Sequence, residues 1–89
     1  MAVRRRVVVS GRVQGVFFRD SCARRAESEG VAGWVRNTPA GEVEGSFEGE
    51  PESVERMVAW CREGPSRADV SDVEVTEEEP TGERRFRVR

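Results

Sequence analysis

Two glycines and an arginine in one short segment form the pattern with the clearest chemical meaning in this sequence. The segment Gly11-Arg-Val-Gln-Gly-Val-Phe-Phe-Arg19 follows the valine run of residues 7–9. An amphipathic pattern typical of a helix begins at about Phe18, so both glycines precede a helix N-terminus. Such a bend presents unpaired backbone N–H groups and the positive end of a helix dipole, and the guanidinium of Arg19 suits phosphate or carboxylate oxygens. The segment therefore predicts a site for a small anion, with phosphate as the favoured ligand.

The residue types that are absent narrow the chemistry further. The chain has no histidine, which excludes an imidazole acid–base pair and a serine or cysteine triad that needs one. It also lacks the glycine-lysine pattern of a nucleotide P-loop. Cys22 follows Arg19 by one helical turn, where a lowered thiol pKa is conceivable, but its place among apolar positions favours a packing role. Phosphoryl transfer remains open, because it depends mainly on positioning and on electrostatic stabilisation.

Length and composition indicate one globular domain. The 89 residues are 36% hydrophobic and 36% charged, with two tryptophans and four phenylalanines that argue against disorder. All fifteen basic residues are arginine and the net charge is −2, so no broad electrostatic attraction to nucleic acid is expected. The run Arg4-Arg5-Arg6 could suggest a basic arm, but it continues into Val7 and is interpreted as the exposed start of a strand.

Hydropathy and cysteine spacing give expectations about location and metals. No apolar stretch is long enough to span a bilayer, and the N-terminus lacks the apolar region of a signal peptide, so a cytoplasmic location is expected. Cys22 and Cys61 form no C-x-x-C pair, and two thiols without histidine make a poor zinc site. Buried free thiols are the favoured interpretation, and no metal site is expected.

Periodicity predicts seven elements. Residues 7–9 are apolar on both faces, as in a central strand, and an apolar stripe along the first helix ends at Gly30 as a left-handed cap. Pro51 suits the first position of a second helix, whose apolar residues recur at i, i+3, i+4 and i+7. The expected strands cover residues 4–13, 31–38, 42–49, 70–77 and 84–89, and the expected helices cover residues 18–29 and Pro51 to the stop at Gly64-Pro65. The first stripe is Phe18, Cys22, Ala23 and Ala26; the second is Val54, Met57, Val58 and Cys61.

The order of these elements predicts a fold. Strand-helix-strand-strand-helix-strand is the ferredoxin-like βαββαβ arrangement of the α+β class, a mostly antiparallel sheet with both helices on one face and a short additional strand at the C-terminus. The third strand places Val43 and Phe47 on one face and Glu42, Glu44, Ser46 and Glu48 on the other. We expect this polar face to meet water. The pairing partner of the last strand is left open by the sequence.

Two motifs resemble the signatures of the acylphosphatase family. Gly-x-Val-Gln-Gly-Val-x-Phe-Arg over residues 11–19 is followed by Gly33-Trp-Val-Arg-Asn37, in the order and at about the distance found in that family. The resemblance continues through Gly41 to Gly45, Trp60, Gly64-Pro65 and Phe86, and so covers nearly the whole chain. It implies the same ferredoxin-like fold and the hydrolysis of acyl phosphates to a carboxylate and inorganic phosphate, without a metal or organic cofactor.

The resemblance also implies roles for individual residues. The loop from Gln14 to Arg19 would wrap the phosphate with its main-chain amides, and Arg19 would bind the phosphate. Asn37 would orient the attacking water, and the proton would pass to a phosphate oxygen of the substrate. Without the family, Asn37 before Thr38-Pro39 would be interpreted as a turn residue. The candidate catalytic residues are thus Arg19 and Asn37, and the candidate substrate-binding residues are Gln14, Gly15, Val16, Phe17, Phe18 and Arg19; Phe17 is a candidate for the acyl side and Phe18 for the core.

Two departures and two alternatives accompany this interpretation. Many relatives carry threonine or serine where this chain has Cys22, and this chain has no tyrosine. A non-catalytic module that binds a small anion on the same fold is the main alternative, although Asn37 speaks against it; an RNA-binding domain would need exposed aromatics and a basic sheet face.

We also expect Cys22 and Cys61 to approach one another near the site. A monomer that acts on a small molecule, without nucleic acid or membrane partners, is expected.

Overall fold

The computed structural model describes all 89 residues and contains the predicted sequence of elements. The elements are β1 (Val3–Arg12), α1 (Phe18–Glu29), β2 (Ala32–Asn37), β3 (Val43–Gly49), α2 (Pro51–Glu63), β4 (Asp69–Glu78) and β5 (Phe86–Val88). Both helices begin and end at the predicted residues, because a glycine with a left-handed φ ends α1 at Gly30 and a proline opens α2. The strand bounds are shifted by one or two residues, and the last strand is shorter than predicted because it pairs only with residues 33–35.

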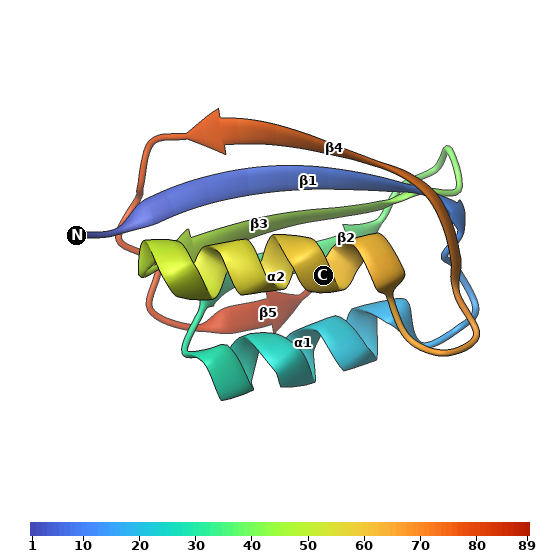
Figure 1. Cartoon of the computed structure of the whole chain (residues 1–89), viewed down its shortest axis with the longest axis horizontal. Helices are drawn as coiled ribbons and strands as arrows, with labels where there is room; N and C mark the ends of the chain where they lie inside the picture. The colour runs from blue at the N-terminus through green and yellow to red at the C-terminus, as the bar shows by residue number, and fades with distance from the viewer.

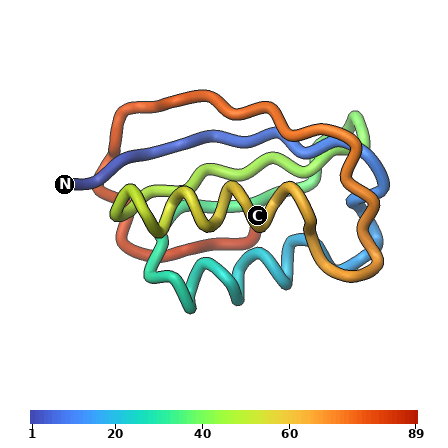
Figure 2. The backbone as a smooth tube through the Cα atoms, viewed as in Figure 1, coloured from blue at the N-terminus to red at the C-terminus, as the bar shows by residue number.

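One mixed sheet carries both helices on the same face (Figure 1). The strand order is β4-β1-β3-β2-β5, with antiparallel pairing throughout the first four strands. The order confirms the ferredoxin-like α+β fold. The last strand, β5, whose partner the sequence left open, pairs in parallel with β2. Figure 2 shows the chain passing from the end of β4 across the end of the sheet to β5 at the opposite edge.

The hydrophobic core lies between the sheet and the two helices. The predicted helical stripes are buried, apart from Ala23, which is half-buried. The ring of Phe18 packs against Trp60 with 5.1 Å between the ring centroids, and it thereby joins the start of α1 to α2. Each such buried side chain contributes about 1.5–3 kcal/mol. Neither helix combines the length and the apolar character that crossing a membrane would require.

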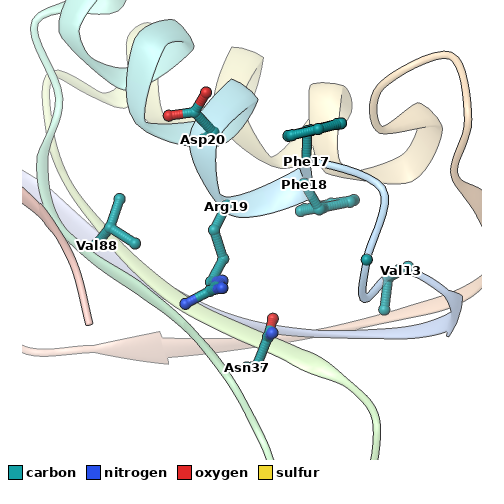
Figure 3. Close-up of a pocket in the computed structure, with 8 residues that line it drawn as sticks. Val13, Phe17, Phe18, Arg19, Asp20, Asn37 and Val88 are labelled. Atoms are coloured by element: carbon teal, nitrogen blue, oxygen red, sulfur yellow. The ribbon is translucent and has the colours of Figure 1, made fainter.

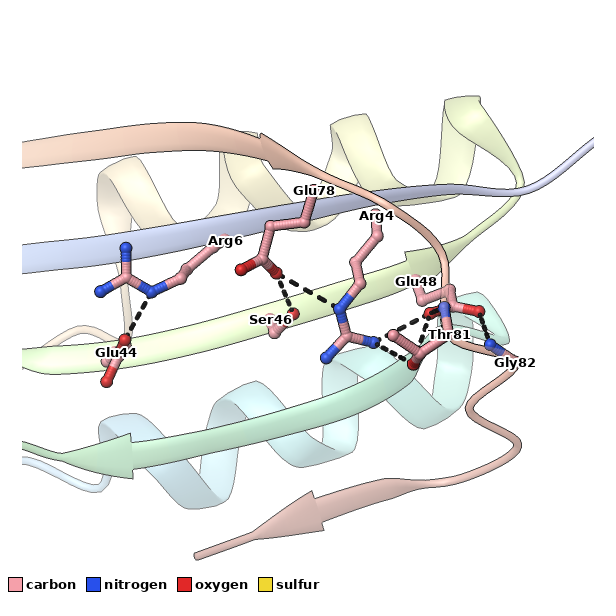
Figure 4. A network of polar contacts seen from close by, with 8 residues as sticks. All are labelled: Arg4, Arg6, Glu44, Ser46, Glu48, Glu78, Thr81 and Gly82. Carbon is pink, nitrogen blue, oxygen red and sulfur yellow. Dashed lines mark hydrogen bonds and ion pairs between the residues drawn. The ribbon is translucent and has the colours of Figure 1, made fainter.

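The outer face of the sheet differs from the prediction. Glu44, Ser46 and Glu48 were expected in water but keep only 7%, 0% and 5% of their surface exposed. Arg4, expected at the exposed start of a strand, keeps 7%. The prediction was wrong because the neighbouring strands and the segment after β4 supply arginines and backbone groups that cover these residues (Figure 4).

Glu44 is held between two arginines of the adjacent strands. It accepts a hydrogen bond from Nε of Arg6 on β1 at 2.5 Å and from Nε of Arg36 on β2 at 2.8 Å. Burial alone would raise the pKa of Glu44, but hydrogen bonds from both guanidinium groups and their charges outweigh it, so the pKa lies below its ordinary value. A carboxylate that is more acidic in the folded than in the unfolded chain stabilises the folded state above its unfolded pKa.

We expect Glu44 to make stability depend on pH with a definite sign. The stabilisation is complete above the unfolded glutamate pKa of about 4.3 and is lost as the pH falls through the lower folded pKa. The difference in unfolding free energy between the wild type and E44Q should therefore be largest at neutral pH and shrink below about pH 4. Urea unfolding at several pH values measures this difference; a difference independent of pH would contradict the buried ion pairs.

Candidate active site

A cavity of about 530 Å³ lies where the start of α1, the end of β2 and the end of β5 meet (Figure 3). Five predicted site residues line it: Gly15, Phe17, Phe18, Arg19 and Asn37. The two signature motifs are thus adjacent in space although they lie on different elements. The sheet produces this arrangement, because β1 and β2 both pair antiparallel with β3 and therefore end at the same end of the sheet.

The backbone before α1 is folded so that its N–H groups stay without helical acceptors. Gly15 and Phe17 both have left-handed φ angles, of 73° and 62°. No side chain caps the helix, and the first bond between α1 and its cap runs from Ser21 N to Phe17 O at 3.0 Å. Phe17 is the one non-glycine residue with a positive φ, a conformation that costs about 1–3 kcal/mol and is concentrated at functional sites. The amides of this turn and the helix dipole are therefore available to an anion.

Two of the predicted substrate-binding residues do not line the cavity with their side chains. The amide Nε2 of Gln14 donates to the carbonyl oxygens of Thr38 at 3.0 Å and Glu42 at 2.9 Å, so it ties the loop to the turn between β2 and β3. Val16 is 6% exposed and belongs to the core. A contribution of these two residues through their main-chain amides stays a prediction.

Arg19 extends from the first turn of α1 into the cavity. Figure 3 shows its guanidinium and the Asn37 amide directed into the same space. One amino group, Nη1, donates to the carbonyl oxygen of Arg89 at 3.3 Å. Arg89 is itself held by a backbone hydrogen bond from its N–H to Val35 O at 2.8 Å, and its guanidinium lies 4.6 Å from the ring centroid of Trp34. The residue after β5 thus contacts Arg19 through its backbone oxygen.

Sequence reasoning missed three lining residues: Val13, Asp20 and Val88. Val13 continues the inward alternation of Val7 and Val9, so the pattern could have identified it. Asp20 lies in the first turn of α1 and pairs with Arg24 at 2.7 Å, a spacing that is visible in the sequence. Val88 arrives through the parallel pairing of β5 with β2, which no local pattern indicated.

The two thiols are buried and in contact, as expected. Cys22 is 0% and Cys61 is 1% exposed, and both are free. A hydrogen bond with Cys61, followed by burial and the nearby thiol's charge, raises the pKa of Cys22 well above its ordinary value. Cys22 is therefore a packing residue and does not act as a thiolate nucleophile, which requires a low pKa.

Comparison with known proteins places the chain and its fold in one family. The profile of the acylphosphatase family matches residues 5–88. An acylphosphatase of Rubrobacter xylanophilus is 63% identical over 94% of this chain and 77% of its own length. An acylphosphatase of Gloeobacter violaceus is 51% identical over 98% of this chain and 94% of its own. The structure of an acylphosphatase from Coxiella burnetii superposes with a TM-score of 0.95 at 42% identity, covering 99% of this chain and 93% of that one.

The chain belongs to the acylphosphatase family. The fold and activity implied by the sequence resemblance are therefore confirmed, whereas the roles of single residues rest on the geometry of the site.

We expect the side chain of Gln14 to support the loop without contacting the substrate. Replacing it by leucine (Q14L) keeps the size but removes both hydrogen bonds to backbone carbonyls, which should cost about 1–3 kcal/mol of stability. The loosened loop should raise KM for an acyl phosphate more than it lowers kcat. Urea unfolding and steady-state kinetics measure both effects. Unchanged stability with a large loss of kcat would contradict the supporting role.

Proposed function

We propose that the cavity at the start of α1 binds the phosphate group of an acyl phosphate and that the chain hydrolyses this bond with Arg19 and Asn37. The observation that carries the proposal is the convergence of three groups on one cavity: the uncapped N-terminus of α1, the Arg19 guanidinium and the Asn37 amide. The first two favour a phosphate, and the third can hydrogen-bond a water molecule.

In this proposal the phosphate is held by charge and by backbone amides. The N–H groups of the Gln14 to Arg19 loop surround its oxygens, and Arg19 neutralises charge as the bond to phosphorus breaks. Such preorganised donors contribute most in a site that excludes bulk water. The carbonyl of Arg89 accepts from Nη1 of Arg19 and leaves the remaining donors of the guanidinium for the phosphate.

Asn37 positions the water that attacks phosphorus. A bond forms between the water oxygen and phosphorus, and the bond from phosphorus to the acyl oxygen breaks. A carboxylate leaves without a strong general acid, and the water proton passes to an oxygen of the phosphate group. This route suits a chain without histidine, because no protein side chain has to gain or lose a proton.

The acyl group lies against the apolar side of the cavity. Phe17 and Val88 line the cavity and are 72% and 49% exposed. An aromatic or aliphatic acyl group would cover them and remove their surface from water. Phe18, by contrast, is 2% exposed and packs on Trp60, so its part is to fix the first turn of α1.

We propose a single-domain enzyme that acts as a monomer in the cytoplasm and needs no metal or organic cofactor. Two thiols in contact without a disulfide suit a reducing compartment. Neither alternative function is supported by the site: Asn37 lines the same cavity as Arg19, and the outer sheet face carries paired charges. Trp34, an aromatic residue on that face, is half-buried and lies under the Arg89 guanidinium.

Replacing Arg19 by alanine (R19A) should lower kcat/KM for benzoyl phosphate by roughly 10³-fold or more, as for the loss of a charge-stabilising arginine in phosphoryl transfer. The control is R12A, which removes an exposed arginine next to the loop that does not line the cavity. R12A should retain near-normal activity. Near-normal turnover by R19A, or equal losses in both variants, would defeat the assignment.

Replacing Asn37 by alanine (N37A) should lower kcat strongly while the affinity for inorganic phosphate changes little. The reason is that the phosphate is bound by Arg19 and the loop amides, whereas the water is needed only for the chemical step. Kinetics with benzoyl phosphate and competitive inhibition by phosphate separate the two quantities. Loss of phosphate inhibition together with turnover would show that Asn37 binds the phosphate instead.

A further inference from the structure

The connection between β4 and β5 has to cross the whole width of the sheet. β4 and β5 lie at opposite edges of the sheet, so the segment 79–85 crosses the ends of β1, β3 and β2 (Figure 2). β5 itself is three residues long and pairs with β2 at three positions. So short a strand makes few pairing hydrogen bonds, and its Phe86 stacks on Phe47 of β3. It brings Val88, and Arg89 after it, to the active site.

Glu48 binds the crossing segment near its middle. One carboxylate oxygen, Oε1, accepts from the backbone N–H of Thr81 at 2.9 Å, and the other, Oε2, accepts from the N–H of Gly82 at 2.8 Å (Figure 4). Glu48 is the last residue but one of β3, the middle strand of the sheet. The carboxylate thus attaches the crossing segment to the middle strand of the sheet.

Arg4 fixes the carboxylate and balances its charge. Its Nη1 donates to Oε1 of Glu48 at 2.8 Å, and its Nε donates to Glu78 at 3.3 Å. The three residues lie in register on β3, β1 and β4. Burial alone would raise the pKa of Glu48, but the hydrogen bonds from Thr81, Arg4 and Gly82 outweigh it, so the pKa is lowered and the group is ionised at neutral pH.

The attached segment continues into β5 and Arg89, which contacts Arg19. Arg85 O accepts from Gly33 N at 3.0 Å, which begins the pairing with β2, and Arg89 ends it at Val35. Gly33 has a φ of 129°, and a Cβ there would lie 1.8 Å from Ser46 O, so no other residue fits this junction. The last link is the Arg89 carbonyl, which accepts from Arg19.

We propose that Glu48 is a positioning residue for the reaction. By fastening residues 81–82 to the centre of the sheet, its ionised carboxylate holds β5 against β2 and keeps Val88 and Arg89 beside Arg19. The inference rests on the proposed function for the role of Arg19, but the attachment itself does not depend on hydrolysis. A carboxylate at the far end of the sheet thereby determines the affinity of the anion site.

Glu44 offers a matched control. It lies on the same strand, is as deeply buried as Glu48, and is likewise paired with arginine. Its partners are Arg6 and Arg36, and neither bonds to the crossing segment. E48Q and E44Q each replace a buried ionised carboxylate by a neutral amide of nearly the same shape, so a general loss of stability should affect both alike.

The experiment compares the wild type, E48Q and E44Q by three measurements. Inorganic phosphate binding is measured by calorimetry, amide hydrogen exchange of residues 79–89 by mass spectrometry, and benzoyl phosphate hydrolysis by steady-state kinetics. We expect E48Q to speed exchange in this segment, to weaken phosphate binding roughly tenfold and to raise KM more than it lowers kcat, since small displacements in a site have effects of this order. E44Q should leave exchange and phosphate affinity near the wild type.

Faster exchange in E48Q with unchanged phosphate affinity, or equal changes in both variants, would overturn the proposal. If E48Q fails to fold, the pair E48D and E44D carries the same comparison, because aspartate keeps the charge but withdraws it from the Thr81 and Gly82 amides. If the wild type binds phosphate but hydrolyses no acyl phosphate, the proposed function fails, while the affinity and exchange data still decide the role of Glu48.

Discussion

The first turn of α1 leaves its backbone N–H groups without helical acceptors, and the chain around it is folded to keep them so. Gly15 and Phe17, in the loop before α1, have left-handed backbone conformations. No side chain forms a capping hydrogen bond with the N-terminus of the helix. The strain at Phe17 is of the order of 1–3 kcal/mol, which is a substantial part of the stability of a small domain. It has to be offset by contacts on every side, and the loop, β2 and β5 supply them.

Those contacts come from three directions. Phe18 packs on Trp60 and fixes the helix from the core side. Gln14 ties the loop to the turn that follows Asn37, so the loop before α1 and the end of β2 are connected by hydrogen bonds. The third contact is the backbone oxygen of Arg89, which accepts from Arg19. Few residues would contact an anion at this turn directly, whereas residues from most of the chain hold the turn in place.

The sequence predicted the architecture well because its signals are local. Glycine and proline mark both helix ends, and the alternation of Val43 and Phe47 identifies the inward face of β3. The site residues were predicted through two motifs, since neither the periodicity nor the chemistry of Asn37 alone distinguishes a water-binding amide from a turn residue. The prediction that Glu44 and Glu48 are exposed to water was wrong, because alternation shows which residues share a face of the sheet but not what covers that face. Their partners, such as Arg6 and the amide of Thr81, lie far away in the sequence.

The pairing of β5 was unpredictable for the same reason. The alternation of Phe86 and Val88 indicates a strand but not its partner, which is decided by the hydrogen bonds of Gly33 and Val35 and by the crossing segment. The sequence therefore did not identify Val88 and Arg89 as residues near the site, and only the structure places them there. Long-range polar contacts, in contrast to apolar patterns, leave no spacing that a single sequence displays.

The central claim is that backbone amides before and within the first turn of α1 bind a phosphate together with Arg19. Titrating the isotopically labelled protein with inorganic phosphate, and following amide and guanidinium resonances by NMR, tests it most directly. We expect saturable shifts concentrated at the amides of residues 15–20 and at the Arg19 side chain. Saturable binding with shifts centred elsewhere, or no binding at millimolar phosphate, would contradict the claim.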